Sequence, residues 1–205
     1  MLPLFPLNVV LFPKSALSLH IFEERYKTLI GECLNKRGME FGINFVDGEN
    51  LSPVGCTAVV KETVQRYEDG RLDIIVEGQR RYELRQIDET VAPYVVGHVA
   101  FLHDEPAQID KLLLEKTIDL YNQIVQVVYK GSLPKLSADS GRHDVSFVMA
   151  QKAGMDLRQR QDLLETTSEN KRLQKLHEYL AGVIPMLQHV NEVQRIVNND
   201  GYIIN

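Results

Sequence analysis

The sequence predicts an α+β protein, with a β-rich N-terminal half followed by a wholly helical C-terminal half. Apolar residues alternate with polar ones in short segments before residue 104, and recur at spacings of three and four after it. The composition is that of an ordinary globular chain able to bury a core, with 44% hydrophobic and 25% charged residues among 205. We therefore expect a β-barrel domain over residues 1–104 and a helical domain over residues 105–205.

The apolar opening, residues 1–22, could be an export signal, a membrane anchor or part of a core. No basic residues precede its apolar run and no small-residue cleavage site follows it, unlike a signal peptide. A spanning helix needs about 20 consecutive apolar residues. The segment is divided into much shorter pieces by Pro3, Pro6 and Pro13. We expect a core segment, no membrane association and a cytoplasmic location.

The rest of the first half predicts a small closed or partly closed barrel with one packed helix. Leu17, Leu19 and Ile21 alternate as in a half-buried strand, and helical spacing follows from Phe22 to a closing Gly38. Asp69-Gly70 stands between two strand-like runs and predicts a hairpin turn. The further strand candidates are 39–46, 54–67, 71–78, 80–89 and 94–102.

The second half predicts helices joined by short loops. A long helix is expected from Pro106 to Gly131, and after a polar loop two short helices are expected over 144–154 and 156–167. A last helix starts near Ser168. The spacing predicts a helical bundle in this half of the chain.

The last helix carries apolar residues in a heptad pattern, which leaves two interpretations open. The seam can pack on other helices of the same subunit, which we favour, or its part beyond Pro185 can pair with a second copy as a homodimer. Pro185 should kink the helix and so weakens a long coiled coil. The seam consists of Leu173, Leu176, Leu180, Val183, Leu187, Val190 and Val197.

Charge and motif content argue against several classes of function. The net charge is −5, whereas proteins that hold phosphate backbones usually carry a basic surplus, so we expect no nucleic-acid partner. Cys33 and Cys56 form no CxxC pair and are expected to be buried free thiols. The histidines are scattered without metal-ligand spacing, and no G-x-S-x-G or G-x-G-x-x-G motif is present. We expect no catalytic residue, no metal and no cofactor.

Five residues are candidates for a peptide-binding surface. Arg80 and Arg81 lie in the most charged part of the β-rich half and could grip a peptide or an RNA backbone. Since successive strand side chains face opposite sides, one of them can instead pair with a nearby glutamate as a structural arginine. Phe12, Phe22 and Tyr26 would form an apolar partner site if they are exposed, and otherwise belong to the core.

Four segments, in the same order, resemble a known family. These segments are "LPLFPLNVVLFPKSALSLHIFEERYKTLI", "VGCTAVV", "DGRLDIIVEGQRRYEL" and "RQDLLETTSENKRLQKLHEYL". The chain from residue 2 to about 185 resembles the Lon N-terminal domain, the substrate-binding module of the ATP-dependent Lon proteases. The resemblance implies a barrel related to the PUA fold, followed by a helical bundle.

The departures from full-length Lon determine the expected activity. The chain ends at Asn205 and has no G-x-x-x-x-G-K-[ST] phosphate loop, so we expect a stand-alone member without ATPase or protease domains. We predict a non-enzymatic recognition module that binds exposed apolar segments of unfolded proteins, or a partner protein, in protein quality control. Two alternatives stay open: an RNA-binding PUA-type module, and a small-ligand binder or enzyme with a site between barrel and helices.

Overall fold

The computed structural model describes residues 1–138 and 144–200, leaving aside the side chains of 191, 192 and 194–200. The chain divides into two compact units. The first comprises Met1–Asp104 and Met155–Thr167, and the second comprises Glu105–Gly154 and the chain from Ser168 onward.

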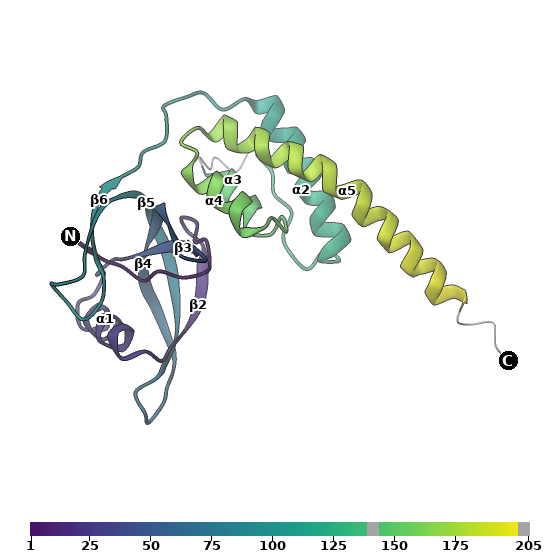
Figure 1. Ribbon diagram of the computed structural model, residues 1–205. Helices are drawn as coiled ribbons and strands as arrows, with labels where there is room; N and C mark the ends of the chain where they lie inside the picture. The colour runs from purple at the N-terminus through teal and green to yellow at the C-terminus, as the bar shows by residue number, and fades with distance from the viewer. Residues whose placement is uncertain (139–143, 201–205) are drawn as a thin grey trace. The chain divides into compact units, whose positions relative to one another are not determined.

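The first unit is built on a six-stranded, mainly antiparallel sheet (Figure 1). Its strand order is β1-β6-β5-β4-β3, and β2 pairs with β5 outside this path. Together with the helices, the sheet confirms the α+β class. The strands are β1 (Leu2–Pro3), β2 (Ala16–Ile21), β3 (Phe41–Asp47), β4 (Asn50–Arg66), β5 (Leu72–Asp88) and β6 (Val96–Phe101).

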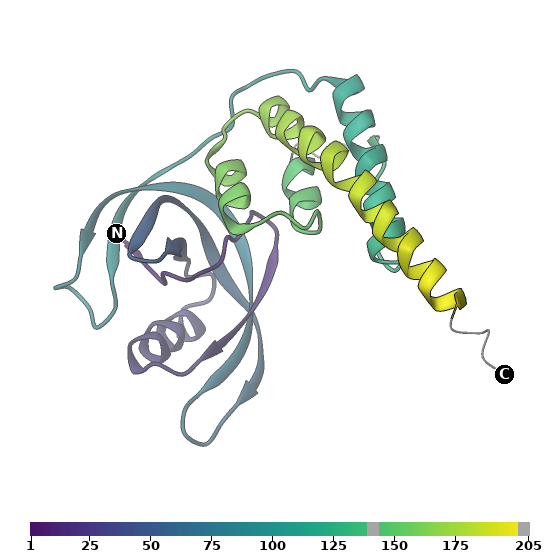
Figure 2. The same cartoon turned by 45° about the vertical axis from the view of Figure 1, so that its right-hand side comes forward.

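The long hairpin of β4 and β5 is the centre of this sheet, and it turns at the predicted Asp69-Gly70 (Figure 2). Gly70 has a φ of +84°, which glycine adopts without strain. The prediction of separate strands over 71–78 and 80–89 was wrong, because β5 runs unbroken through Gly78. A Cβ at Gly78 would lie 2.2 Å from the carbonyl oxygen of Phe12, so the backbones approach there as only glycine allows.

The apolar opening segment is core, as predicted. Leu4 and Leu7 form parallel bridges with Gly42 and Phe45 of β3. Leu4 is fully buried, and Phe12 is 1% exposed. Within the described residues no helix is both long and apolar enough to cross a membrane.

Helix α1 (Glu24–Asn35) covers the core of the first unit with the apolar face that its spacing predicted. Tyr26, Leu29, Ile30 and Cys33 are its buried residues. The ring of Tyr26 stacks on Phe5, with centroids 3.9 Å apart. Burial of this face against the sheet, more than the intrinsic preference of its residues, stabilises a helix this short.

Helix α4 (Leu157–Glu165) belongs to the first unit, although we expected it inside the helical domain. Asp156 caps it by accepting a hydrogen bond from the backbone N–H of Gln159, and the Gln159 side chain accepts one from the backbone N–H of Asp156. The local signals predicted this helix correctly. They could not predict that it packs against β4.

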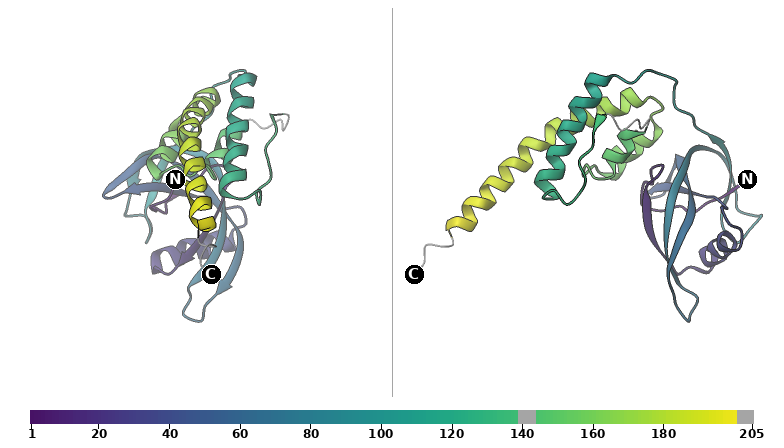
Figure 3. Two further views of the ribbon diagram at one scale, coloured as in Figure 1. Left: turned by 90° about the vertical axis from the view of Figure 1, so that its right-hand side faces the viewer. Right: turned by 180° about the vertical axis from the view of Figure 1, so that it is seen from behind.

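The second unit contains α2 (Lys111–Val128), α3 (Val145–Ala150) and α5 (Glu169–Asp200), and Figure 3 shows α2 beside α5. Leu173, Leu176 and Leu180 are fully buried here. The first part of the heptad seam therefore packs within its own subunit, as the favoured interpretation expected, and the side chain of Val197 lies outside the described residues. α2 begins at Lys111 with Asp110 as N-cap, so the predicted start at Pro106 was wrong.

A buried polar cluster fixes α3 to α5 in the second unit. Arg172 is fully buried and donates to Glu169 Oε2 at 2.5 Å from Nη2 and to Ser146 Oγ at 2.9 Å from Nε. Glu169 also accepts from the Ser146 backbone N–H. The guanidinium lies over the Phe147 ring, 4.4 Å from its centroid. With its charge paired, Arg172 can occupy a core position.

Candidate functional site

The outer edge of β2 is an open strand edge in the first unit. Ala16–Ile21 pairs with β5 in antiparallel register, and β2 pairs with no other strand in the part of the chain that the structure describes. Leu17 and Leu19 pack against the core but remain partly exposed. An open edge presents backbone donors and acceptors to which an extended peptide can add as a further strand.

A cluster of aromatic and charged side chains lies at the end of β2. His20 Nδ1 lies 2.6 Å from Asp73 Oδ1, and the Tyr67 hydroxyl donates to Asp73 Oδ2 at 2.7 Å. These hydrogen bonds, the one with His20 first, hold the pKa of the Asp73 carboxyl below its usual value. The hydrogen bond that the Tyr67 hydroxyl donates to Asp73 raises the pKa of Tyr67, because it stabilises the protonated phenol.

Phe22 adds an exposed apolar surface next to this cluster. Its side chain is 59% exposed, and its ring stacks on that of His20 with centroids 6.0 Å apart. Tyr67 meets the His20 ring edge-on at 5.9 Å. Of the three aromatic residues predicted for a binding surface, Phe22 is the one that solvent reaches.

Phe12 and Tyr26 lie in the interior, so they cannot be surface contacts in this structure. Phe12 is 1% exposed and Tyr26 is 5% exposed. The alternative interpretation, that they belong to the core, describes both of them. Phe22 is exposed because it lies before the first turn of α1. Tyr26 is buried because it lies on the face of that helix that packs on the core.

Arg81 is buried as well, and it acts as a structural residue. Its guanidinium donates to the carbonyl oxygens of Leu164 at 2.7 Å and Thr166 at 2.9 Å, and it pairs with Asp104. One of the two arginines was expected to have this role, with a glutamate as partner. The observed partners are instead Asp104 and the carbonyls at the C-terminal end of α4, which helical bonding leaves unsatisfied.

Arg80 faces the opposite way and reaches the surface. Its Nη2 donates to both carboxylate oxygens of Glu40 at 3.1 Å, and its guanidinium lies 3.8 Å from the centroid of the Phe101 ring. A ligand that engaged Arg80 would therefore have to compete with Glu40. Phe22 and Arg80 are the two predicted residues that the structure places within reach of a partner.

The sequence did not predict a binding role for the β2 residues or for the tyrosine beside them, namely Leu17, Leu19, His20 and Tyr67. The alternation in residues 17–21 predicted a half-buried strand, and it indicated no binding site there. Whether a strand lies at an edge depends on its neighbours in the sheet, which the alternation does not specify. The partner of His20, Asp73, lies 53 residues further along the chain.

The chain belongs to the family of the substrate-binding domain of the ATP-dependent protease La (LON), whose model matches residues 1–182. It is 24% identical over 196 residues to Lon protease 3 of Sorangium cellulosum, covering 89% of this chain and 23% of that protein. It is 31% identical over 119 residues to a Lon protease of Parabacteroides distasonis, covering 54% and 14%. The chain thus spans about a quarter or less of these relatives.

Two solved structures have the same fold. One is a Lon N-terminal domain protein from Xanthomonas campestris, with a TM-score of 0.66 and 23% identity over 85% of this chain and 95% of that one. The other is the N-terminal domain of a Mycobacterium avium complex Lon protease, with a TM-score of 0.67 and 14% identity over 88% and 97%. At these identities the likeness establishes the fold alone.

Proposed function

We propose that this protein is a non-enzymatic recognition module that binds exposed apolar segments of unfolded proteins at the outer edge of β2. The substrate-binding family of the chain supports a recognition role. The observation that carries the proposal is the open edge itself, where Leu17 and Leu19 stay partly exposed and Phe22 is 59% exposed. Partly exposed apolar side chains beside an open strand edge are features of protein-binding surfaces.

Binding would combine two contributions. Backbone hydrogen bonds to the β2 edge are independent of sequence, which suits a module that meets many unfolded chains. Apolar side chains of the incoming strand would rest on Leu17, Leu19 and the Phe22 ring. This contribution selects apolar segments over polar ones.

The test is calorimetry of the full chain with a reduced, alkylated model protein and with short apolar peptides. Two variants separate the contributions: Phe22→Ala removes the exposed ring, and Ser18→Lys places a charge on the exposed edge, which disfavours strand pairing. Both should weaken binding. Leu112→Ala is the matched control, because it removes an apolar side chain that is 60% exposed on α2, and it should bind as the wild type does.

Melting temperatures of all three variants should match that of the wild type, because each residue is exposed. If the wild type binds neither probe at millimolar concentration, peptide binding is excluded. If Leu112→Ala loses as much affinity as Phe22→Ala, the site is not at β2.

We also propose that the sheet closes as a PUA-like barrel and that the C-terminal helices form a bundle. The parallel bridges of Leu4 and Leu7 to β3 support closure.

A homodimer through α5 is supported by Met186, Val190 and Val193, which are 68%, 52% and 45% exposed. Sedimentation of the wild type and a Met186→Glu, Val190→Glu double variant tests it. A cytoplasmic location remains a prediction.

A further inference from the structure

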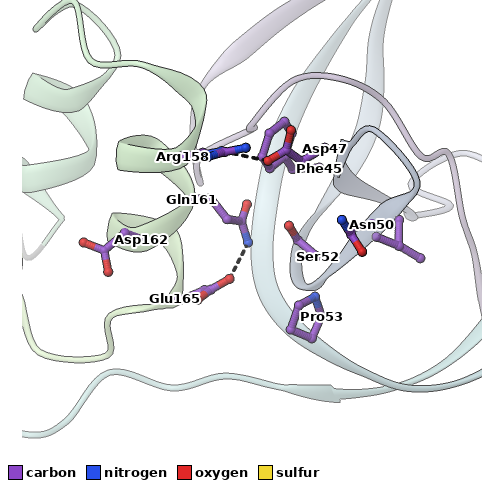
Figure 4. Close-up of a pocket in the computed structure, with 10 residues that line it drawn as sticks. Phe45, Asp47, Asn50, Ser52, Pro53, Arg158, Gln161, Asp162 and Glu165 are labelled. Atoms are coloured by element: carbon purple, nitrogen blue, oxygen red, sulfur yellow. Dashed lines mark hydrogen bonds and ion pairs between the residues drawn. The ribbon is translucent and has the colours of Figure 1, made fainter.

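A second surface feature of the first unit is a hollow between α4 and the turn that joins β3 to β4. It has a volume of about 330 Å³, comparable with the smaller ligand pockets of proteins. Figure 4 shows the Gln161 side chain extending from α4 toward the strand that carries Ser52 and Pro53. The hollow is lined by Phe45, Asp47, Asn50, Leu51, Ser52, Pro53, Arg158, Gln161, Asp162 and Glu165.

Gln161 points a buried, unpaired acceptor into this hollow. The residue is 6% exposed, and its Nε2 donates to the Val54 carbonyl and to Glu165 Oε1, both at 2.9 Å. Both partners only accept, so the orientation of the amide is fixed with the nitrogen toward them. Oε1 is left without a hydrogen-bond partner among the described residues. A buried acceptor without a donor is unfavourable, and a ligand that supplies one relieves it.

The charges around the hollow select the kind of donor. Asp47 and Glu165 contribute two carboxylates, against the single guanidinium of Arg158, whereas the Asp162 carboxylate points away from the strands (Figure 4). Arg158 Nε already donates to Asp47 Oδ2 at 2.8 Å. The lining therefore has an excess of negative charge and of acceptors, which favours a cationic donor over a neutral or anionic one.

The apolar part of the lining favours a cation that is carried on an alkyl chain. Phe45, Leu51 and Pro53 form the wall on the strand side of the hollow. A short methylene chain can lie along such a wall while its charged end reaches polar groups, as lysine side chains commonly do.

We propose that this hollow binds a primary alkylammonium group, either the side chain of a lysine in a peptide or a free alkyl diamine. The ammonium donates to Gln161 Oε1 and pairs with the Glu165 carboxylate, while its methylene chain lies along Phe45 and Leu51. This site uses none of the β2 residues, so it is independent of the proposed binding of apolar segments.

The experiment is an NMR titration of the ¹⁵N-labelled full chain, observing the side-chain amide of Gln161. The probes are N-acetyl-lysine methylamide, its norleucine counterpart, which keeps the chain but lacks the ammonium, and 1,5-diaminopentane. Saturable shifts of the Gln161 amide are expected with both amines and not with norleucine. Tighter binding of the lysine compound identifies a peptide as the source of the ammonium, and tighter binding of the diamine identifies a free amine.

Glu165→Gln tests the charge. The new amide oxygen can still accept from Gln161 Nε2, so the fold of the site is kept while one negative charge is lost. Affinity for the amines should fall about tenfold, which corresponds to the loss of one charge-assisted hydrogen bond. Glu68→Gln, on an exposed turn residue outside the lining, should leave affinity unchanged.

Three results would each overturn the proposal. They are no saturable shift with either amine, equal binding of the norleucine compound, or the same loss of affinity in both variants. Melting curves of the two variants establish that each is folded before its affinity is compared.

Discussion

Arg81 on β5 donates a hydrogen bond from Nη1 to the carbonyl oxygen of Leu164 on α4 at 2.7 Å, across 83 positions in the sequence. The same nitrogen reaches the Thr166 carbonyl at 2.9 Å. A buried guanidinium thus takes up the free carbonyls at the end of a helix and fixes that helix to the sheet. A second hydrogen bond, from Gln161 Nε2 on α4 to the Val54 carbonyl oxygen of β4, runs in the opposite direction and also fixes α4 to the sheet.

Replacing Arg81 by methionine should destabilise the protein by about 2–4 kcal/mol, because buried carbonyls and Asp104 lose their donor. Urea denaturation measures this, and hydrogen exchange should show the largest loss of protection in α4. Arg80→Met is the matched control on the adjacent, exposed residue, and should cost less than about 1 kcal/mol. Equal effects of the two substitutions would contradict the structural role of Arg81.

Glycine at position 42 is required by the packing of Tyr82. A Cβ at Gly42 would lie 2.2 Å from the Tyr82 hydroxyl oxygen, and Tyr82 is fully buried, with its hydroxyl donating to Asn44 Oδ1 at 2.5 Å. Gly42→Ala should therefore destabilise by about 2–3 kcal/mol through overpacking.

The control for Gly42→Ala is Gly31→Ala within α1, where an added Cβ meets nothing within 4 Å. That substitution should stabilise by about 0.5–1 kcal/mol, since alanine favours the helix. Thermal or urea unfolding of both variants tests the contrast. A stable Gly42→Ala variant would mean that Tyr82 has room to move.

The two cysteines should be almost unreactive in the folded protein. Burial is the main cause that raises the pKa of Cys33 to about 11 and that of Cys56 to about 12, from an ordinary value of 9.0. Their thiolate fractions near neutral pH fall by about a hundredfold and a thousandfold. Alkylation with mass spectrometry should find both protected, Cys56 more strongly, and both reactive in urea.

The direction of the pH effect of these thiols follows from the same shifts. Folding keeps both thiols neutral, so their contribution to stability is complete below pH 9.0 and is lost as the pH rises above it. Rapid alkylation of Cys56 in the native protein would show that the core opens around β4.

The stabilising contribution of Asp73 should be lost in acid. Its folded pKa lies below the ordinary value of 3.8 because His20 and Tyr67 donate to its carboxylate. The stability that it contributes is present above that ordinary value and is lost as the pH falls through the folded pKa. Asp73→Asn should flatten the acid side of the plot of melting temperature against pH.

Asp119→Asn, at an exposed position of α2, is the control for this measurement and should leave the acid slope as it is in the wild type. An unchanged slope in Asp73→Asn would show that the contact between His20 and Asp73 does not persist in solution.

The sequence by itself determined the local elements of the fold. The three prolines of the opening segment excluded a spanning helix, and Asp69-Gly70 specified the central hairpin. The spacing from Tyr26 to Cys33 specified the buried face of α1, although Phe22, which the same spacing included, lies before the helix and is exposed. These features depend on neighbours within a few residues, so their physical causes can be read along the chain. The motif order also identified the family.

Only the tertiary structure decided where α4 lies and which candidate residues are accessible. Asp156 and Gln159 cap α4 through local contacts, whereas its place on the sheet depends on Arg81, far away in the sequence. Periodicity gives the face of a strand or helix on which Phe12, Phe22 or Arg81 lies, but not what covers that face. Exposure is set by long-range packing, which no local pattern encodes.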